Sequence, residues 1–203
     1  MICKYYTNST NCTISTNNTN FWKCDFMEKK YNKYLLQFNN ETRQHSLNVA
    51  KLCKQFAYTE ELDEELAYKV GLLHDIGKIY IPSRILKKDT RLDNLERQII
   101  DLHSYYGYKL LKEELKEPPE VYLSVLYHHG YGKVKLENIN EPITENAVKL
   151  IRLVHCLDIF EAMTSDRIYH KAKSPSIALE VVENDDMCSD YLKEELNKAY
   201  DEK

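Results

Sequence analysis

The sequence has no excess of basic residues, since 28 lysines and arginines stand against 32 aspartates and glutamates and leave a net charge of −4. This balance argues against the strongly basic surface that binds a nucleic-acid polymer, so we expect no such partner. A small anionic substrate stays open, because bound metal ions can supply the positive charge that the chain as a whole lacks.

A membrane-spanning run is also missing. The most apolar stretch, residues 148–160, contains Lys149, Arg152, His155 and Asp158. It therefore predicts a buried helix and no membrane partner. The first residues turn polar at once, which leaves no room for the apolar region of a signal peptide. The six cysteines include no Cys-x-x-Cys pair, which is typical of free thiols in a cytoplasmic protein.

Sustained period-two alternation is absent as well, so we predict an all-α fold. Residues 1 to about 20 are rich in Asn, Thr and Ser, which indicates a polar leader. The aromatic and aliphatic residues from Phe21 to Phe38 recur at helical spacing and predict a short helix packed against the main domain. Further helices are expected over about 41–57, 63–74, 92–115, 118–129, 144–162 and 191–200, with another beginning at Ser174.

Five of the seven histidines form a pattern. A single histidine in a helix is more often a packed or surface residue than a metal ligand. Here His74-Asp75 and His128-His129 each lie at the end of a predicted helix, shortly before a glycine. Consecutive side chains at a helix end can point into a shared cavity, whereas neighbours inside a helix diverge by about 100°.

Other residues are spaced to join these two pairs. Glu41 and His45 are four residues apart and share a helix face. His103 and Gly107 have the same spacing, and the glycine would let a neighbouring backbone approach the histidine. Asp158 is a carboxylate inside an apolar helix, so we expect it to bind a metal or to form a salt bridge. Mixed imidazole and carboxylate ligands favour iron, manganese or zinc over calcium or magnesium alone.

Together these motifs resemble the HD-GYP subgroup of the HD metal-dependent phosphohydrolase superfamily. The matching strings are H-S-L-N-V-A from His45, L-L-H-D-I-G-K-I-Y-I-P from Leu72, H-S-Y-Y-G-Y-K-L-L from His103, the pair at 128–129, and D-I-F-E-A-M-T-S-D-R-I-Y from Asp158. The resemblance implies an HD-domain helical bundle that encloses a di- or trinuclear metal centre. Residues 41–203 would form the HD-GYP-like catalytic domain, and residues 1–40 a polar leader plus a short N-terminal helix.

The resemblance implies a set of metal ligands, carried over position by position. These are Glu41, His45, His74, Asp75, His103, His128, His129 and Asp158. Asp75 would bridge two metals, and Glu41 matches the additional ligand of the subgroup's three-metal members. The implied cofactors are two or three divalent transition metal ions, iron or manganese, and three metals are favoured over two.

Substrate contacts are implied in the same way. Lys78 resembles the family lysine at the scissile phosphate, and it would act in catalysis together with Asp75. A lysine at a helix end also interacts favourably with the helix dipole, which is the simpler interpretation of Lys78. Arg167 matches an arginine that contacts substrate phosphate, and His170 occupies a second position that is often basic. Tyr131 is the remaining implied substrate contact.

The activity implied by the resemblance is hydrolysis of a cyclic dinucleotide, cyclic di-GMP to pGpG and/or GMP, in bacterial signalling. The subgroup's Gly-Tyr-Pro string is rewritten here as Gly130-Tyr131-Gly132. Three hypotheses therefore stay open. The protein hydrolyses cyclic di-GMP, or it hydrolyses another substrate such as cyclic GMP-AMP or a phosphomonoester, or it is a weakly active or inactive module that binds a nucleotide or a protein. The loop 130–142 is the expected contact for a protein partner.

Overall fold

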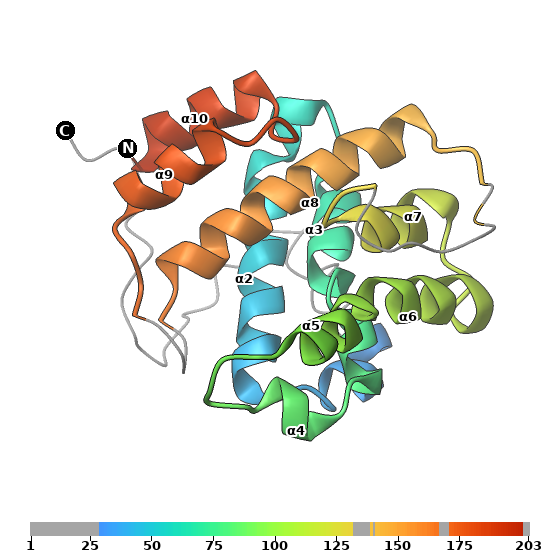
Figure 1. Ribbon diagram of the computed structural model, residues 1–203. Helices are drawn as coiled ribbons and strands as arrows, with labels where there is room; N and C mark the ends of the chain where they lie inside the picture. Colours follow the sequence, from blue (N-terminus) through green and yellow to red (C-terminus); the bar gives the residue numbers. More distant parts are fainter. Residues whose placement is uncertain (1–28, 132–138, 140, 167–170, 201–203) are drawn as a thin grey trace, which may run out of the picture.

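The protein is described by a computed structural model over residues 29–131, 139, 141–166 and 171–200 (Figure 1). Within these ranges the chain forms helices and no strand, which confirms the all-α prediction. None of the helices in the described ranges is both long and apolar enough to cross a membrane.

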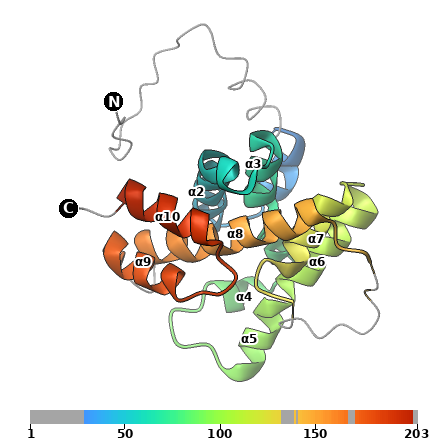
Figure 2. The same ribbon diagram turned by 90° about the horizontal axis from the view of Figure 1, so that it is seen from above.

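The helices form one bundle around a long central helix. The main helices are α2 (Asn40–Phe56), α3 (Glu64–Leu73), α5 (Asn94–Asp101), α6 (His103–Lys109), α7 (Pro119–Tyr127), α8 (Glu145–Thr164), α9 (Pro175–Glu183) and α10 (Asp190–Tyr200). Shorter elements are η1 (Ala57–Glu60), η2 (Ile76–Tyr80), α4 (Ser83–Leu86) and η3 (Leu110–Glu114). Both views show α9 and α10 beside one end of α8 and α6 and α7 beside the other (Figures 1 and 2).

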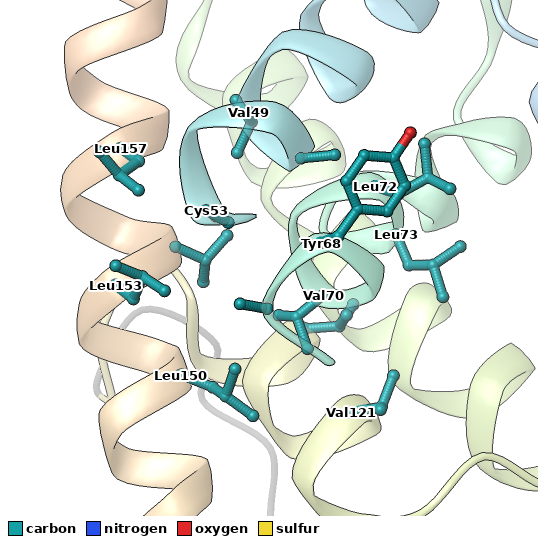
Figure 3. Close-up of a cluster of buried hydrophobic side chains, with 14 of the residues drawn as sticks. Val49, Cys53, Tyr68, Val70, Leu72, Leu73, Val121, Leu150, Leu153 and Leu157 are labelled. Atoms are coloured by element: carbon teal, nitrogen blue, oxygen red, sulfur yellow. The ribbon is translucent and has the colours of Figure 1, made fainter. Parts of the chain in front are cut away.

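The core lies where α2, α3 and α8 meet (Figure 3). On α8, Leu150, Leu153 and Leu157 are spaced three and four residues apart and therefore share one buried face. Helix α3 also contacts α7, and its residues from Val70 to Leu73 are all buried. A helix that is apolar on nearly every side belongs in the interior. The C-terminal end of α3 therefore lies in the middle of the bundle.

Helices α2 and α3 pack closely because Gly71 has no side chain. A Cβ atom at this position would lie 2.7 Å from the Cα atom of Ala50 on α2. The short distance between the two helices brings His45 of α2 next to His74, which follows α3.

The predicted continuous helix over 92–115 is wrong. Helix α5 ends at Asp101, α6 begins at His103 and a π-helical turn, η3, follows. The backbone bends at Leu102, where ψ is −12° and departs from the usual α-helical value. Nδ1 of His103 donates a hydrogen bond to the carbonyl oxygen of Ile100. This side-chain hydrogen bond competes with the backbone hydrogen bonds that a continuous helix would need. Helix α2 begins at Asn40, close to the predicted start at residue 41, and the side chain of Asn39 caps it.

The predicted packing of the N-terminal aromatic residues is confirmed where the chain is described. Residues 29–35 are helical, and Tyr31 and Leu35 are buried in the main core. The Tyr31 hydroxyl donates a hydrogen bond to Glu117 at 2.6 Å. Residues 1–28, which include Phe21, lie outside the described residues.

The packing of the core predicts how much stability is lost when a buried leucine is truncated to alanine. Leu153→Ala should lower the free energy of unfolding by about 2–5 kcal/mol, because Leu153 is buried between α8 and α3 and its loss leaves a cavity. Urea denaturation at equal metal loading measures this. Leu95→Ala, at an exposed position on α5, is the control and should change stability by less than about 0.5 kcal/mol. Equal effects of the two substitutions would contradict this view of the core.

Candidate metal centre

The ends of α3 and α7 present the two paired motifs, as the sequence predicts. His74 caps the C-terminus of α3, and His128 caps the C-terminus of α7. Gly130 follows with a positive φ of 100°, a conformation that favours glycine and ends the helix. The C-terminal end of a helix carries partial negative charge, so both ends favour a nearby cation.

Three histidines are oriented by the same hydrogen bond. The Nδ1 atoms of His74, His103 and His128 each donate to the carbonyl oxygen three residues earlier, at 2.7, 2.6 and 2.7 Å. An imidazole that carries its hydrogen on Nδ1 keeps the Nε2 lone pair available as a metal ligand. The backbone therefore selects the tautomer that can bind a metal through Nε2.

The arrangement of the Nε2 atoms of His103 and His128 indicates whether a metal ion fits between these side chains. Their Nε2 atoms lie 3.3 Å apart in the interior, and in this tautomer neither Nε2 carries a hydrogen. Two lone pairs that face each other at this distance repel unless a cation lies between them or beside them. The donor set thus fits a metal ion, and imidazole is a common ligand for zinc, iron and manganese.

The ligand atoms form two groups, which are compatible with divalent metal binding. One group contains His45, His74 and Asp158, and the other contains His103, His128 and His129. Within each group the ligand atoms all lie within 4.8 Å of one another.

Asp75 lies between the two groups. Its Oδ2 atom is 3.4 Å from Nε2 of His74 and 3.8 Å from Nε2 of His45. Its Oδ1 atom is 3.3 Å from Nε2 of His103. The two oxygens of one carboxylate thus face different histidine groups, which is the arrangement of a bridging ligand.

Apart from the bridging Asp75, Glu41 is the one predicted ligand that lies in neither group among the described residues. It lines two cavities that meet at His45, one of about 460 Å³ and one of about 540 Å³. Glu41 therefore lies beside the group that contains His45.

The carboxylates of Asp75 and Asp158 are held ionised by their neighbours. Burial alone would raise the pKa of Asp75, but Lys78 and then His74 outweigh it and keep that pKa well below its usual range. Asp158 is half-buried, and its contacts with His45 and His74 outweigh that partial burial and hold its pKa well below the usual range. Both side chains therefore present a negative charge to a cation.

The histidines differ in charge. Burial lowers the pKa of His103 to about 4 and holds that of His128 well below its usual value, so both rings are neutral near pH 7. Burial also disfavours a charged His45, yet Asp158 and Glu161 outweigh it and raise its pKa to about 9. In the absence of metal, His45 accordingly carries the proton that balances the acidic side of the centre.

Glu161 is the residue that sequence reasoning missed. It lies one helical turn after Asp158 on α8, is buried, and accepts a hydrogen bond from Nδ1 of His45. It also accepts from Asn48 at 2.8 Å and from Ser165 at 2.7 Å, which fixes its orientation. Its spacing of three residues from Asp158 is the signal that places both carboxylates on one face of α8.

His155 has a structural role. Its Nδ1 atom donates to the carbonyl oxygen of His128 at 2.7 Å, and its Nε2 atom lies 3.1 Å from Oδ2 of Asp185. It thereby links the end of α7 to the chain after α9.

Gly77 and Gly107 let two backbones meet at the histidines. A Cβ atom at Gly77 would lie 1.9 Å from the carbonyl oxygen of His103 and 2.4 Å from the amide nitrogen of Gly107. The expected close approach at Gly107 is confirmed, and Gly77 supplies the tighter half of the contact. Together they fix the distance between Asp75 and His103.

The predicted substrate residues are only partly placed. Lys78 donates to Oδ2 of Asp75 at 2.6 Å and lines the cavity of about 460 Å³. Tyr131 is exposed, and its ring packs against Tyr127 with centroids 5.0 Å apart. Arg167 and His170 lie outside the described residues, as does most of the loop 130–142.

Gly77→Ala tests the close backbone contact. The added methyl group must push His103 away from Asp75, so we expect a loss of about 1–3 kcal/mol in stability and a lower metal content. Thermal unfolding and metal analysis by mass spectrometry measure the two effects. Gly130→Asn is the control, because asparagine tolerates a positive φ and should leave metal content closer to wild type. Normal metal content in Gly77→Ala would count against the contact.

Glu161→Gln tests the orientation of His45. The substitution keeps the shape of the side chain but removes the charge that His45 faces, so metal affinity should fall by about 10–100-fold. Competition with a fluorescent chelator measures the affinity. Glu145→Gln, an exposed position on the same helix, is the matched control and should bind metal like the wild type. Identical affinities for the two variants would show that Glu161 does not support the site.

Comparisons with known proteins agree with this geometry. Residues 42–173 match the family model of the HD domain. The chain is 30% identical over 144 residues to cyclic di-GMP phosphodiesterase PA4108 of Pseudomonas aeruginosa, covering 68% of this chain and 34% of that protein. It is 29% identical over 153 residues to 3'3'-cGAMP-specific phosphodiesterase 1 of Vibrio cholerae, covering 72% of this chain and 34% of that protein. The chain thus spans about a third of the length of these relatives.

A solved structure shows the same fold. The HD domain of the L. monocytogenes phosphodiesterase PgpH, solved in complex with cyclic di-AMP, aligns with a TM-score of 0.55 at 20% identity. The alignment covers 87% of this chain and 98% of that one. The predicted HD-domain bundle is therefore confirmed, and the chain belongs to the HD domain family.

Proposed function

We propose that the protein is a metal-dependent phosphodiesterase that hydrolyses a cyclic dinucleotide, with cyclic di-GMP as the favoured substrate. The observation that carries the proposal is the pair of three-residue ligand groups with the Asp75 carboxylate between them. Two relatives of the chain are phosphodiesterases of cyclic di-GMP and of 3'3'-cGAMP, which supports this substrate class.

The proposed metal ligands are those of the two groups, with Asp75 as the bridge. Glu41 is proposed as the additional ligand of a third metal, because it lines the cavities next to His45. The mixture of imidazole and carboxylate favours iron or manganese. When bound, two such ions supply Lewis-acid activation of the phosphate and of the attacking water.

Lys78 is the residue of the chain that is best placed to act on the substrate. Its ammonium group is held at Asp75 by the 2.6 Å hydrogen bond and also lines the cavity. A cation in this position binds a phosphate oxygen and stabilises the negative charge that develops on the leaving oxygen. Asp75 therefore positions Lys78 as well as the metals.

Further substrate contacts are proposed for Arg167, His170 and Tyr131, on the basis of their places in the family motifs. The proposed catalytic domain is residues 41–203, and the loop 130–142 is proposed as the contact for a protein partner. Cys53, Cys156 and Cys188 are free thiols, which supports a reducing, cytoplasmic environment.

A substrate panel tests the proposal. The protein, loaded with manganese or iron under reducing conditions, is incubated with cyclic di-GMP, cyclic GMP-AMP, cyclic di-AMP and bis(p-nitrophenyl) phosphate. We expect cyclic di-GMP to be converted to pGpG, because the centre can activate water next to a phosphodiester held by Lys78. Chromatography of the products identifies the substrate and the extent of hydrolysis.

Each other result has a definite meaning. Faster turnover of cyclic GMP-AMP would change the assigned substrate within the same class. Turnover of the p-nitrophenyl ester alone, or tight binding of a dinucleotide without product, would overturn the proposal. Asp75→Ala should lose both bound metal and turnover, and retained turnover would rule out the proposed centre.

A further inference from the structure

The cavity beside the metal centre extends well beyond the metal ligands. Its volume is about 460 Å³. One side is formed by His45 and Lys78, and another by the segment from Ile85 to Leu92, which comprises the end of α4 and most of the connection to α5. A single phosphate group at the metals would fill only part of this space, so the segment 85–92 faces the remainder of a larger ligand.

Besides His45, one arginine and two lysines line the cavity, and their charges differ in how they are balanced. Lys78 is paired with Asp75 at 2.6 Å, and Lys88 is paired with Glu96 at 2.5 Å. Arg91 is exposed and has no ion-pair partner among the described residues. The positive charge of Arg91 is therefore the one in this lining that is available to an anionic ligand.

The loop that carries Arg91 is closed by one carboxylate. Oε2 of Glu96 accepts a hydrogen bond from Lys88 at 2.5 Å and from the backbone amide of Asp93 at 2.9 Å. The Asp93 side chain in turn accepts from the amide of Glu96 at 2.8 Å, which completes a capping box at the start of α5. Arg91 thus lies within a loop whose two ends are fastened, which lowers the entropy lost when it binds a ligand.

We propose that Arg91 binds the second phosphodiester of the cyclic dinucleotide, the one that is not at the metal centre. A cyclic dinucleotide carries two phosphodiesters on opposite sides of one ring, so the second lies away from the metals while the first is held there. The planar guanidinium group forms two parallel hydrogen bonds to a phosphate, which a lysine cannot do. This inference rests on the proposed function and assigns the residue that selects for two phosphates over one.

Steady-state kinetics of Arg91→Ala test the inference. We expect kcat/KM for the cyclic dinucleotide to fall by about 10–100-fold, mainly through KM, because a charge-assisted bidentate contact is lost. The loss on bis(p-nitrophenyl) phosphate, which has one phosphate, should be at least about fivefold smaller. Arg91→Lys keeps the charge without the planar fork and should give an intermediate value.

Arg84→Ala is the matched control. Arg84 is an exposed arginine on α4, seven residues before Arg91, and it does not line the cavity. It should stay within about twofold of the wild type on both substrates. Equal effects of Arg84→Ala and Arg91→Ala on the dinucleotide, or an equal loss by Arg91→Ala on both substrates, would overturn the inference.

The two proposals fail in different ways. Absence of dinucleotide turnover by the wild type contradicts the proposed function, whatever Arg91 does. Dinucleotide turnover by the wild type with no selective loss in Arg91→Ala contradicts only the role of Arg91.

Discussion

Asp75 is a buried carboxylate at the centre of a helical bundle, and much of the structure is arranged around its charge. An ionised carboxylate in the interior is costly unless cations and hydrogen-bond donors surround it. Lys78 donates to one of its oxygens, and histidines from separate helices face both of them. Residues 70–73 at the C-terminal end of α3 are all buried, and they place this carboxylate close to α2, α6, α7 and α8.

Hydrogen bonds to backbone carbonyl groups and to Glu161 orient the histidines around Asp75. Carbonyl oxygens three residues earlier hold His74, His103 and His128 in the tautomer that leaves Nε2 available. His45 lies inside α2, where its own backbone offers no such free carbonyl, and Glu161 of α8 performs the same function. The break between α5 and α6 has the same origin, because His103 uses the carbonyl of Ile100.

The candidate metal ligands and the cavity beside them come from different parts of the chain. The ligands come from helices and helix ends that are buried and closely packed, with Gly77 and Gly107 in backbone contact. The far side of the cavity comes from the connection between α4 and α5, which Glu96 closes. Under the proposed function, this division would keep the metal ligands on a rigid scaffold while a loop that tolerates change contacts the substrate.

The sequence by itself determined the helical class, the approximate helix positions and the histidine–carboxylate pattern, because apolar periodicity, helix-end signals and ligand types are local properties of the chain. It also predicted the close approach at Gly107. Only the tertiary structure decided which histidines face each oxygen of Asp75, that Glu161 orients His45 across 116 residues, and that Arg91 shares a cavity with Lys78. These contacts join residues that are distant in the chain. They depend on how α2, α3 and α8 pack, and no periodic pattern in the sequence indicates them.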